Sequence, residues 1–86
     1  MAETVQLNAG WTTIGWPATA PAMTNEQVLE RLDADGFQPV AISRYWGGRN
    51  IVHPYKSTAE IWQMEAGKGY FVQTGTMGTW TLPGSP

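Results

Sequence analysis

Few side chains in this sequence are of the types that carry out catalysis. The only histidine is His53, and the three serines, Ser43, Ser57 and Ser85, do not stand in the strand–turn–helix setting of a hydrolase nucleophile. With one histidine and no cysteine, the chain also lacks the usual ligands of a transition-metal site. We therefore expect His53 to be a strand or loop residue rather than a general base, and we expect no metal site.

Paired carboxylates are the second arrangement that could support chemistry. Asp33 and Asp35 lie at the end of a predicted helix, and Glu60 and Glu65 flank a tryptophan-containing segment. Glycoside hydrolysis needs two carboxyl groups that face each other across a cleft, and an 86-residue chain has little room for one. Segment 67–69 lacks the longer glycine-rich frame of a phosphate-binding loop. We therefore expect a non-enzymatic protein with no catalytic residues and no cofactor.

Aromatic and basic side chains gather between residues 44 and 56, on either side of a Gly-Gly pair. Exposed aromatic rings beside cationic groups can stack on sugars or bases, or can anchor a protein interface. The alternative is that Trp46 and Tyr55 simply fill the core. The candidate partner-binding residues are Arg44, Tyr45, Trp46, Arg49, His53, Tyr55 and Lys56.

The overall composition fits one small domain that works in contact with a partner. Charged residues make up only 14% of the chain, against about 25% in an average domain. Five Trp, three Tyr and two Phe supply the large side chains that so small a core needs. The net charge of −2 argues against non-specific nucleic-acid binding, and no apolar run has the length of a transmembrane helix. We expect neither nucleic acid nor membrane as a partner.

One helix is predicted over residues 25–34. Thr24 is a favourable N-cap, and Gln27 stands three residues later, as in a capping box. Gly36 suits the left-handed position just beyond a helix end. The apolar face of this helix consists of Val28, Leu29 and Leu32. A helix of this length is marginal alone, so its apolar face must pack on a sheet.

In the rest of the chain, polar and apolar residues alternate and glycines separate the segments, as is typical of β-structure. Strands are expected at 4–7, 11–16, 40–46, 50–53, 60–64, 70–74 and 79–82, with a tight hairpin turn at Gly47-Gly48. The predicted fold class is α+β: a small antiparallel sheet or roll with one short helix packed on it. We expect a single domain over 1–86, with its core within about 5–82 and flexible ends at 1–4 and 83–86. The expected core residues are Trp11, Ile14, Trp16, Val28, Leu29, Leu32, Tyr70, Val72 and Trp80.

Three segments of the chain occur together in a known family. They are 10–17 (GWTTIGWP), the helix 25–32, and 67–72 (GKGYFV), with an aromatic strand between them. In this order they resemble the GWNLIG-type β-rich modules of bacterial and archaeal surface proteins and of phage virion proteins. Thr12-Thr13 replace the usual Asn-Leu, and Phe71 replaces the usual Trp. The resemblance implies non-catalytic display or attachment and carries over no binding residue.

Two functions are expected from these features. The first is a bacteriophage capsid cement or decoration protein, found in the virion after assembly in the host cytoplasm and bound to the major capsid protein and to copies of itself. This expectation is based on a small chain that begins at its own Met1, contains no cysteine, and has few charged and many aromatic residues. The alternative is a carbohydrate-binding or cell-surface-binding module that uses exposed aromatic residues and is located outside the cell or on its surface.

Overall fold

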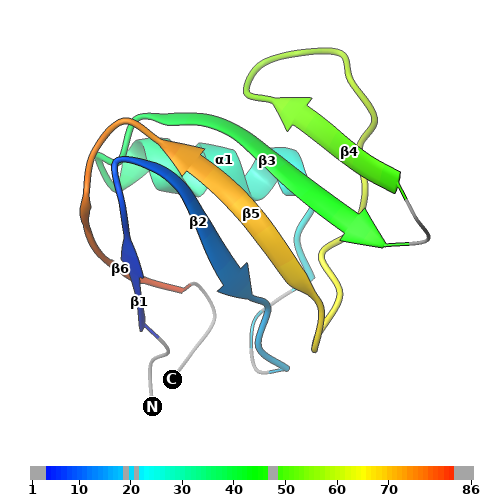
Figure 1. Ribbon diagram of the computed structural model, residues 1–86, viewed down its shortest axis with the longest axis horizontal. Coiled ribbons are helices and arrows are strands. Elements are labelled where there is room, and N and C mark those ends of the chain that lie inside the picture. Colours follow the sequence, from blue (N-terminus) through cyan, green and yellow to red (C-terminus); the bar gives the residue numbers. More distant parts are fainter. Residues whose placement is uncertain (1–3, 19, 21, 47–48, 83–86) are drawn as a thin grey trace.

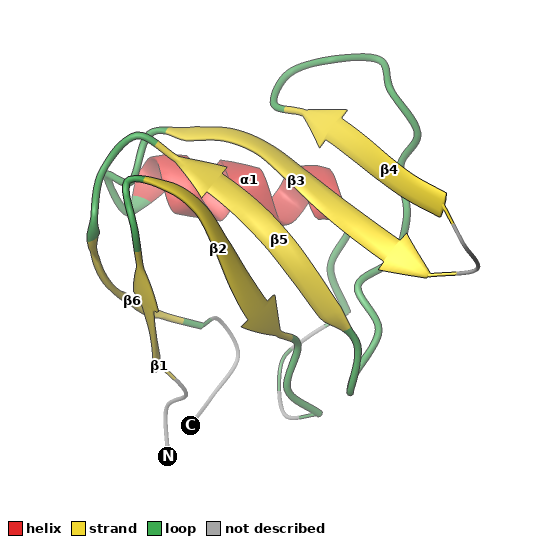
Figure 2. Cartoon of the chain, in the orientation of Figure 1, coloured by secondary structure: helices red, strands yellow, loops and turns green. Residues whose placement is uncertain are grey.

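The structure is a computed structural model that describes residues 4–18, 20, 22–46 and 49–82, with the backbone alone described at 45, 46 and 49. The elements of this part of the chain follow in the order β1 (Thr4–Leu7), β2 (Gly10–Gly15), α1 (Asn25–Ala34), β3 (Pro39–Trp46), β4 (Arg49–Pro54), β5 (Gly69–Thr74) and β6 (Gly78–Thr81). The predicted α+β class, with one short helix packed on antiparallel strands, is confirmed (Figure 1, Figure 2).

The strands form two sheets rather than one. Four strands pair in the order β2-β5-β3-β4, and β1 pairs separately with β6; all pairings are antiparallel. Helix α1 covers one face of the four-stranded sheet, and the β1–β6 ribbon lies beside β2 at one end (Figure 1). The sheet therefore has one face turned to the helix and one face turned away from it.

Helix α1 begins and ends through local hydrogen bonds that its sequence predicts. The Thr24 hydroxyl accepts from the Gln27 N–H at 3.2 Å, and the Thr24 N–H donates to the Gln27 side chain at 2.9 Å, which completes the capping box. At the other end, Gly36 has φ +87°, and the Phe37 N–H donates to the Leu32 carbonyl. This is a Schellman ending, and the positive φ explains why glycine stands there.

The core lies between α1 and the four-stranded sheet and is closed at one end by β1 and β6. Eight of the nine residues expected in it are at most 3% exposed: Ile14, Trp16, Val28, Leu29, Leu32, Tyr70, Val72 and Trp80. The expectation for Trp11 is wrong, because this side chain is 45% exposed. The Trp80 Nε1–H donates to Asp35 Oδ2 at 2.8 Å, which ties β6 to the end of the helix.

The strand predicted over 60–64 is replaced by an extended segment held against the start of α1. The Asn25 Oδ1 accepts from the Trp62 N–H at 3.2 Å, and the Asn25 Nδ2 donates to the Glu60 carbonyl at 3.1 Å. A single bridge, between Thr24 and Gln63, is all the β pairing the segment makes with the described residues. The sequence alternation that predicts a strand here reflects burial of Trp62 and Met64 beside exposed Ile61 and Gln63.

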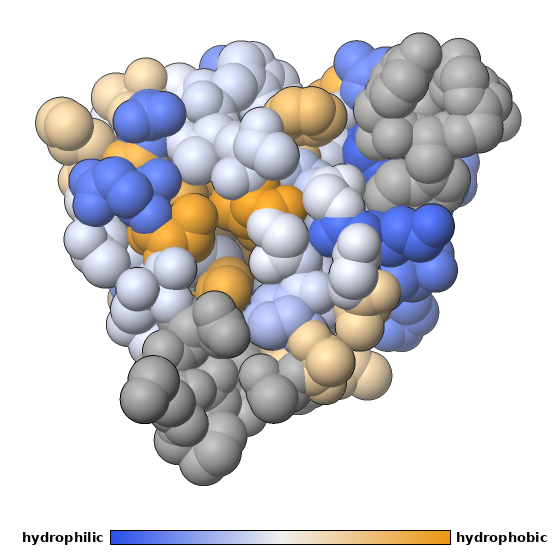
Figure 3. Space-filling view, turned by 60° about the horizontal axis from the view of Figure 1, so that its bottom comes forward, coloured by the Kyte–Doolittle hydropathy of each residue, from blue (hydrophilic) through white to orange (hydrophobic). Residues whose placement is uncertain are grey.

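Some expectations fall near the limits of the described chain. The expectation of a flexible end at 1–4 is wrong for Thr4, which pairs with Thr81 in the β1–β6 ribbon. The predicted Gly47-Gly48 turn and the ends 1–3 and 83–86 lie outside the described residues. Figure 3, in which the lower side of Figure 1 comes forward, shows hydrophobic residues gathered near the middle of that face, with hydrophilic residues to either side.

Candidate functional site

Arg44, the first residue of the candidate segment, is engaged inside the molecule. Its guanidinium lies 4.8 Å from the centre of the Trp62 ring and forms a 3.0 Å ion pair with Glu60. Its side chain is 18% exposed. Arg44 therefore holds the 60–62 segment against the sheet, and little of it is left to meet a partner.

The expectation that His53 contacts a partner is wrong, because its side chain is fully buried. His53 pairs with Ile42 across the β3–β4 ladder and faces the helix with it. Its Nε2 lies 2.6 Å from the Glu26 Oε1, and its ring meets the Trp62 ring edge-on at 6.3 Å. A buried imidazole whose Nε2 is already hydrogen-bonded has no path to a substrate, so this pair is a structural contact between β4 and α1.

Tyr55 and Lys56 lie at the end of β4, beside the helix. The Tyr55 hydroxyl donates to Asp33 Oδ2 at 3.0 Å, and the Lys56 Nζ lies 5.3 Å from the centre of the Tyr55 ring. Burial, followed by the hydrogen bond and negative charge of Asp33, raises the pKa of Tyr55 above 10.0. The side chains of three other candidates, Tyr45, Trp46 and Arg49, lie outside the described part of the chain.

Segment 44–56 therefore does not present one continuous contact surface in the part that is described. Successive side chains of a strand point to opposite faces of the sheet. Arg44 and His53 point to the helix side, and their neighbours Ser43 and Val52 point away from it. Residues that are close together in this segment of the sequence therefore lie on two different faces of the molecule.

The candidate binding surface is the outer face of the four-stranded sheet, which is the face turned away from α1. We define it by Trp11 and Thr13 on β2, Phe71 and Gln73 on β5, Ala41 and Ser43 on β3, and Asn50 and Val52 on β4. The register places Thr13, Phe71, Ser43 and Val52 in one row across the four strands. Three of these side chains are large, apolar and exposed: Trp11 (45%), Val52 (41%) and Phe71 (39%).

Trp11 is exposed because of its register on β2. Trp11 pairs with Gln73, and Thr12 pairs with Val72, a residue of the core. Since alternate residues face opposite sides, Thr12 and Ile14 turn toward the helix and Trp11 turns outward. Trp16, beyond the end of the strand, returns to the core. Two tryptophans five positions apart therefore have opposite roles.

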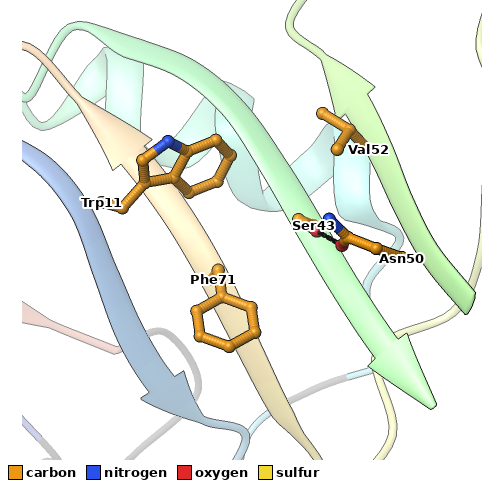
Figure 4. Close-up of a pocket in the computed structure, with 5 residues that line it drawn as sticks. All are labelled: Trp11, Ser43, Asn50, Val52 and Phe71. Atoms are coloured by element: carbon orange, nitrogen blue, oxygen red, sulfur yellow. Dashed lines mark hydrogen bonds between the residues drawn. The ribbon is translucent and has the colours of Figure 1, made fainter. Parts of the chain in front are cut away.

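A shallow hollow of about 340 Å³ lies on the outer face, lined by Trp11, Ser43, Asn50, Val52 and Phe71 (Figure 4). The inner strand β3 carries the small side chain of Ser43 here, which is 3% exposed. The Trp11 and Phe71 rings stand on one side of Ser43, and Val52 and Asn50 stand on the other (Figure 4). Ser43 thus forms a floor between larger neighbours.

The polar groups of the hollow are a serine–asparagine pair. The Ser43 hydroxyl donates to Asn50 Oδ1 at 2.5 Å. This bond uses the amide oxygen of Asn50 and leaves the Nδ2 donors, for which no acceptor occurs among the described residues. None of the five lining residues is charged, so the hollow combines aromatic surface with neutral hydrogen-bonding groups.

The sequence does not predict most of this site. Its patterns place Trp11 in the core and single out none of the other four lining residues, Phe71, Val52, Ser43 and Asn50, as a contact. The available signal was the alternation on 70–74, in which Tyr70, Val72 and Thr74 are buried and Phe71 is not. A phenylalanine between buried positions of a strand indicates an aromatic ring on the opposite face.

Other kinds of site are not formed by the described residues. In that part of the chain, no group of three or more His, Cys, Asp or Glu side chains is placed to hold a metal ion. The described helix is too short to cross a membrane. No protein family, curated protein or solved structure matches this chain.

Proposed function

We propose that this chain is a non-catalytic binding module that holds carbohydrate in the hollow of its outer sheet face. Of the two functions expected from the sequence, the geometry favours this one, in which the protein is extracellular or lies at a cell surface. The observation that carries the proposal is the pairing of two half-exposed aromatic rings, Trp11 and Phe71, with the Ser43–Asn50 hydrogen bond in one uncharged hollow.

The chemistry of a sugar ring is matched to such a surface. One face of a pyranose presents C–H groups that pack on an aromatic ring, and its edge presents hydroxyl groups that need hydrogen-bond partners. Binding sites of this kind are mostly apolar, with a few polar groups that fix the orientation of the ligand. Because the lining residues stand on paired strands, little conformational freedom is lost on binding.

The test is a screen of oligosaccharides by NMR chemical-shift perturbation with the wild-type protein. We expect binding at millimolar or lower concentration, with shifts at Trp11, Asn50 and Phe71. A Phe71→Ala variant should lose binding and keep its fold. The matched control is Thr13→Ala, which stands in the same row of the outer face but does not line the hollow. If no oligosaccharide in the screen shifts the spectrum of the folded protein, the proposal is wrong.

The second candidate is the capsid decoration protein, and the apolar character of the outer face supports it. A stable protein interface buries about 800 Å² on each partner, which is roughly a sixth of the 4739 Å² surface of this molecule. Such a contact with a major capsid protein would cover much more than the hollow. The resemblance to GWNLIG-type modules stays a prediction and fits either setting.

Density-gradient fractionation of the native lysate tests the decoration function. Co-migration with particles of megadalton size, abolished by Trp11→Ala together with Val52→Ala, supports attachment to a virion through the outer face. Migration of the wild-type protein near its own 9.4 kDa contradicts it.

A further inference from the structure

We infer that the hollow of the outer face selects electrically neutral sugars and discriminates against acidic ones, such as uronic acids and sulfated sugars. This inference rests on the proposed function, because it takes carbohydrate as the ligand of that hollow. Beyond that function, it specifies the chemical class of sugar that is bound and the residues that determine this selectivity.

The hollow is surrounded by neutral side chains among the described residues. Its five lining residues are neutral, and so are Thr13, Ala41 and Gln73 on the rest of the outer face. The basic residue nearest in sequence to the floor, Arg44, follows Ser43 on β3 and points to the opposite face, where it is paired with Glu60. Among the described residues, a carboxylate entering the hollow would therefore lose hydration without gaining an ion pair, which is unfavourable.

The hydrogen bond between Ser43 and Asn50 sets which further hydrogen bonds these two side chains can make. The Ser43 hydroxyl donates to Asn50 Oδ1, so the amide group is held with Nδ2 donors that none of the described residues uses. A neutral amide donor satisfies the oxygen of a sugar hydroxyl but does not neutralise a carboxylate. The Ser43 oxygen, itself almost fully buried in the floor, keeps lone pairs that can accept from a hydroxyl of the same sugar.

The size of the hollow suits a single sugar ring. The volume of about 340 Å³ is near the lower limit of small-molecule sites, which run from about 300 to 1,000 Å³. The walls are Trp11 and Phe71 on one side and Val52 on the other, so the space between them suits a single ring with an apolar face. A terminal or single accessible neutral sugar unit fits these dimensions better than a long charged polysaccharide lying across the sheet.

The experiment compares matched sugars that differ only at C6. Dissociation constants are measured at pH 7 by NMR titration for a neutral methyl pyranoside and for the corresponding methyl uronate salt, using the sugar type that binds best in the screen. We expect the neutral sugar to bind at least tenfold more tightly. In Asn50→Asp the donors are replaced by a carboxylate, and neutral binding should fall at least tenfold.

A charge-introducing pair of variants completes the test. Val52→Lys places a cation at the wall of the hollow and should reduce or reverse the preference for the neutral sugar over the acidic one. Thr13→Lys, on the same face but outside the hollow, should leave this preference unchanged. Circular dichroism spectra confirm that each variant is folded. If wild type binds the acidic sugar as well as the neutral one, the inference is wrong and the proposed function stands. If the folded protein binds neither sugar, both are wrong.

Discussion

The two faces of the four-stranded sheet are made by the same strands and have opposite properties. On the inner face, Ile14, Ile42, His53, Tyr70 and Val72 are at most 2% exposed and pack under helix α1. On the outer face, Trp11, Val52 and Phe71 are 39–45% exposed and nothing described covers them. Each strand therefore contributes to stability with one set of alternate residues and to a candidate binding surface with the other.

The polar residues on the two faces have different roles. On the inner face, His53 is isolated from water, and its Nε2 needs the Glu26 carboxylate as a partner. On the outer face, Asn50 is exposed and, among the described residues, its side chain is bonded only through its oxygen, so its donors remain open to a ligand. The Nε2 of His53 bonds to Glu26 and ties β4 to the helix, although its buried Nδ1 has no hydrogen-bond partner among the described residues, whereas the exposed donors of Asn50 are suited to recognition.

A pair of tryptophan variants tests whether the two faces differ in their contribution to stability. Trp16→Ala removes a side chain that is 3% exposed and should cost about 3–5 kcal/mol of unfolding free energy. Trp11→Ala removes one that is 45% exposed and should cost about 1 kcal/mol or less. Urea unfolding followed by circular dichroism measures both. Equal losses in the two variants would show that the outer face also contributes to the core.

A second test removes the partner of His53. Glu26→Ala leaves the buried Nε2 without its hydrogen bond and should cost about 1–3 kcal/mol of unfolding free energy. Glu26→Gln keeps an oxygen within reach and should lose less. Glu30→Ala, on the exposed surface of the same helix, is the control and should change stability by about 0.5 kcal/mol at most. A Glu26→Ala protein as stable as the control would remove the structural role assigned to the pair.

The capping box of the helix that covers the inner face gives a smaller effect. Thr24→Ala removes the acceptor for the Gln27 N–H and should lower the unfolding free energy by about 1 kcal/mol. Thr58→Ala, at an exposed threonine in the loop that follows β4, is the matched control. Thermal unfolding should separate the two variants. No difference between them would show that the Gln27 side chain alone is enough to begin the helix.

The smallest expected effect is a loss of stability at alkaline pH. Burial raises the pKa of Tyr70, and burial together with Asp33 raises the pKa of Tyr55, both from 10.0. The folded state therefore favours the protonated phenols. Their contribution is fully present below pH 10 and is lost as the pH rises through the higher folded-state values. Urea unfolding between about pH 8 and pH 11 should show this decline, and Tyr55→Phe should reduce its slope. A Tyr55→Phe protein with an unchanged slope would exclude Tyr55 as a contributor.

Local sequence determined the elements of this fold to a large extent. The capping box at Thr24 and Gln27 and the glycine at position 36 fixed the ends of the helix, because caps act through bonds between near neighbours in the chain. The alternation of the strands located β1, β2, β3, β4, β5 and β6 to within a residue or two. The same alternation predicts a strand at 60–64 that does not form. Burial alternates there, but the side chain of Asn25 takes the place of a neighbouring strand as the hydrogen-bond partner.

The candidate site depended on information that the sequence does not carry locally. Composition and spacing identified Trp11 and Trp16 as equivalent aromatic residues, and they identified 44–56 as one cluster. Only the pairing of β2 with β5 decided that Trp11 faces outward, and only the pairing of β3 with β4 separated His53 from Val52. The physical reason is that a strand has two faces, and which one is buried is settled by the helix that packs on it, not by the strand itself.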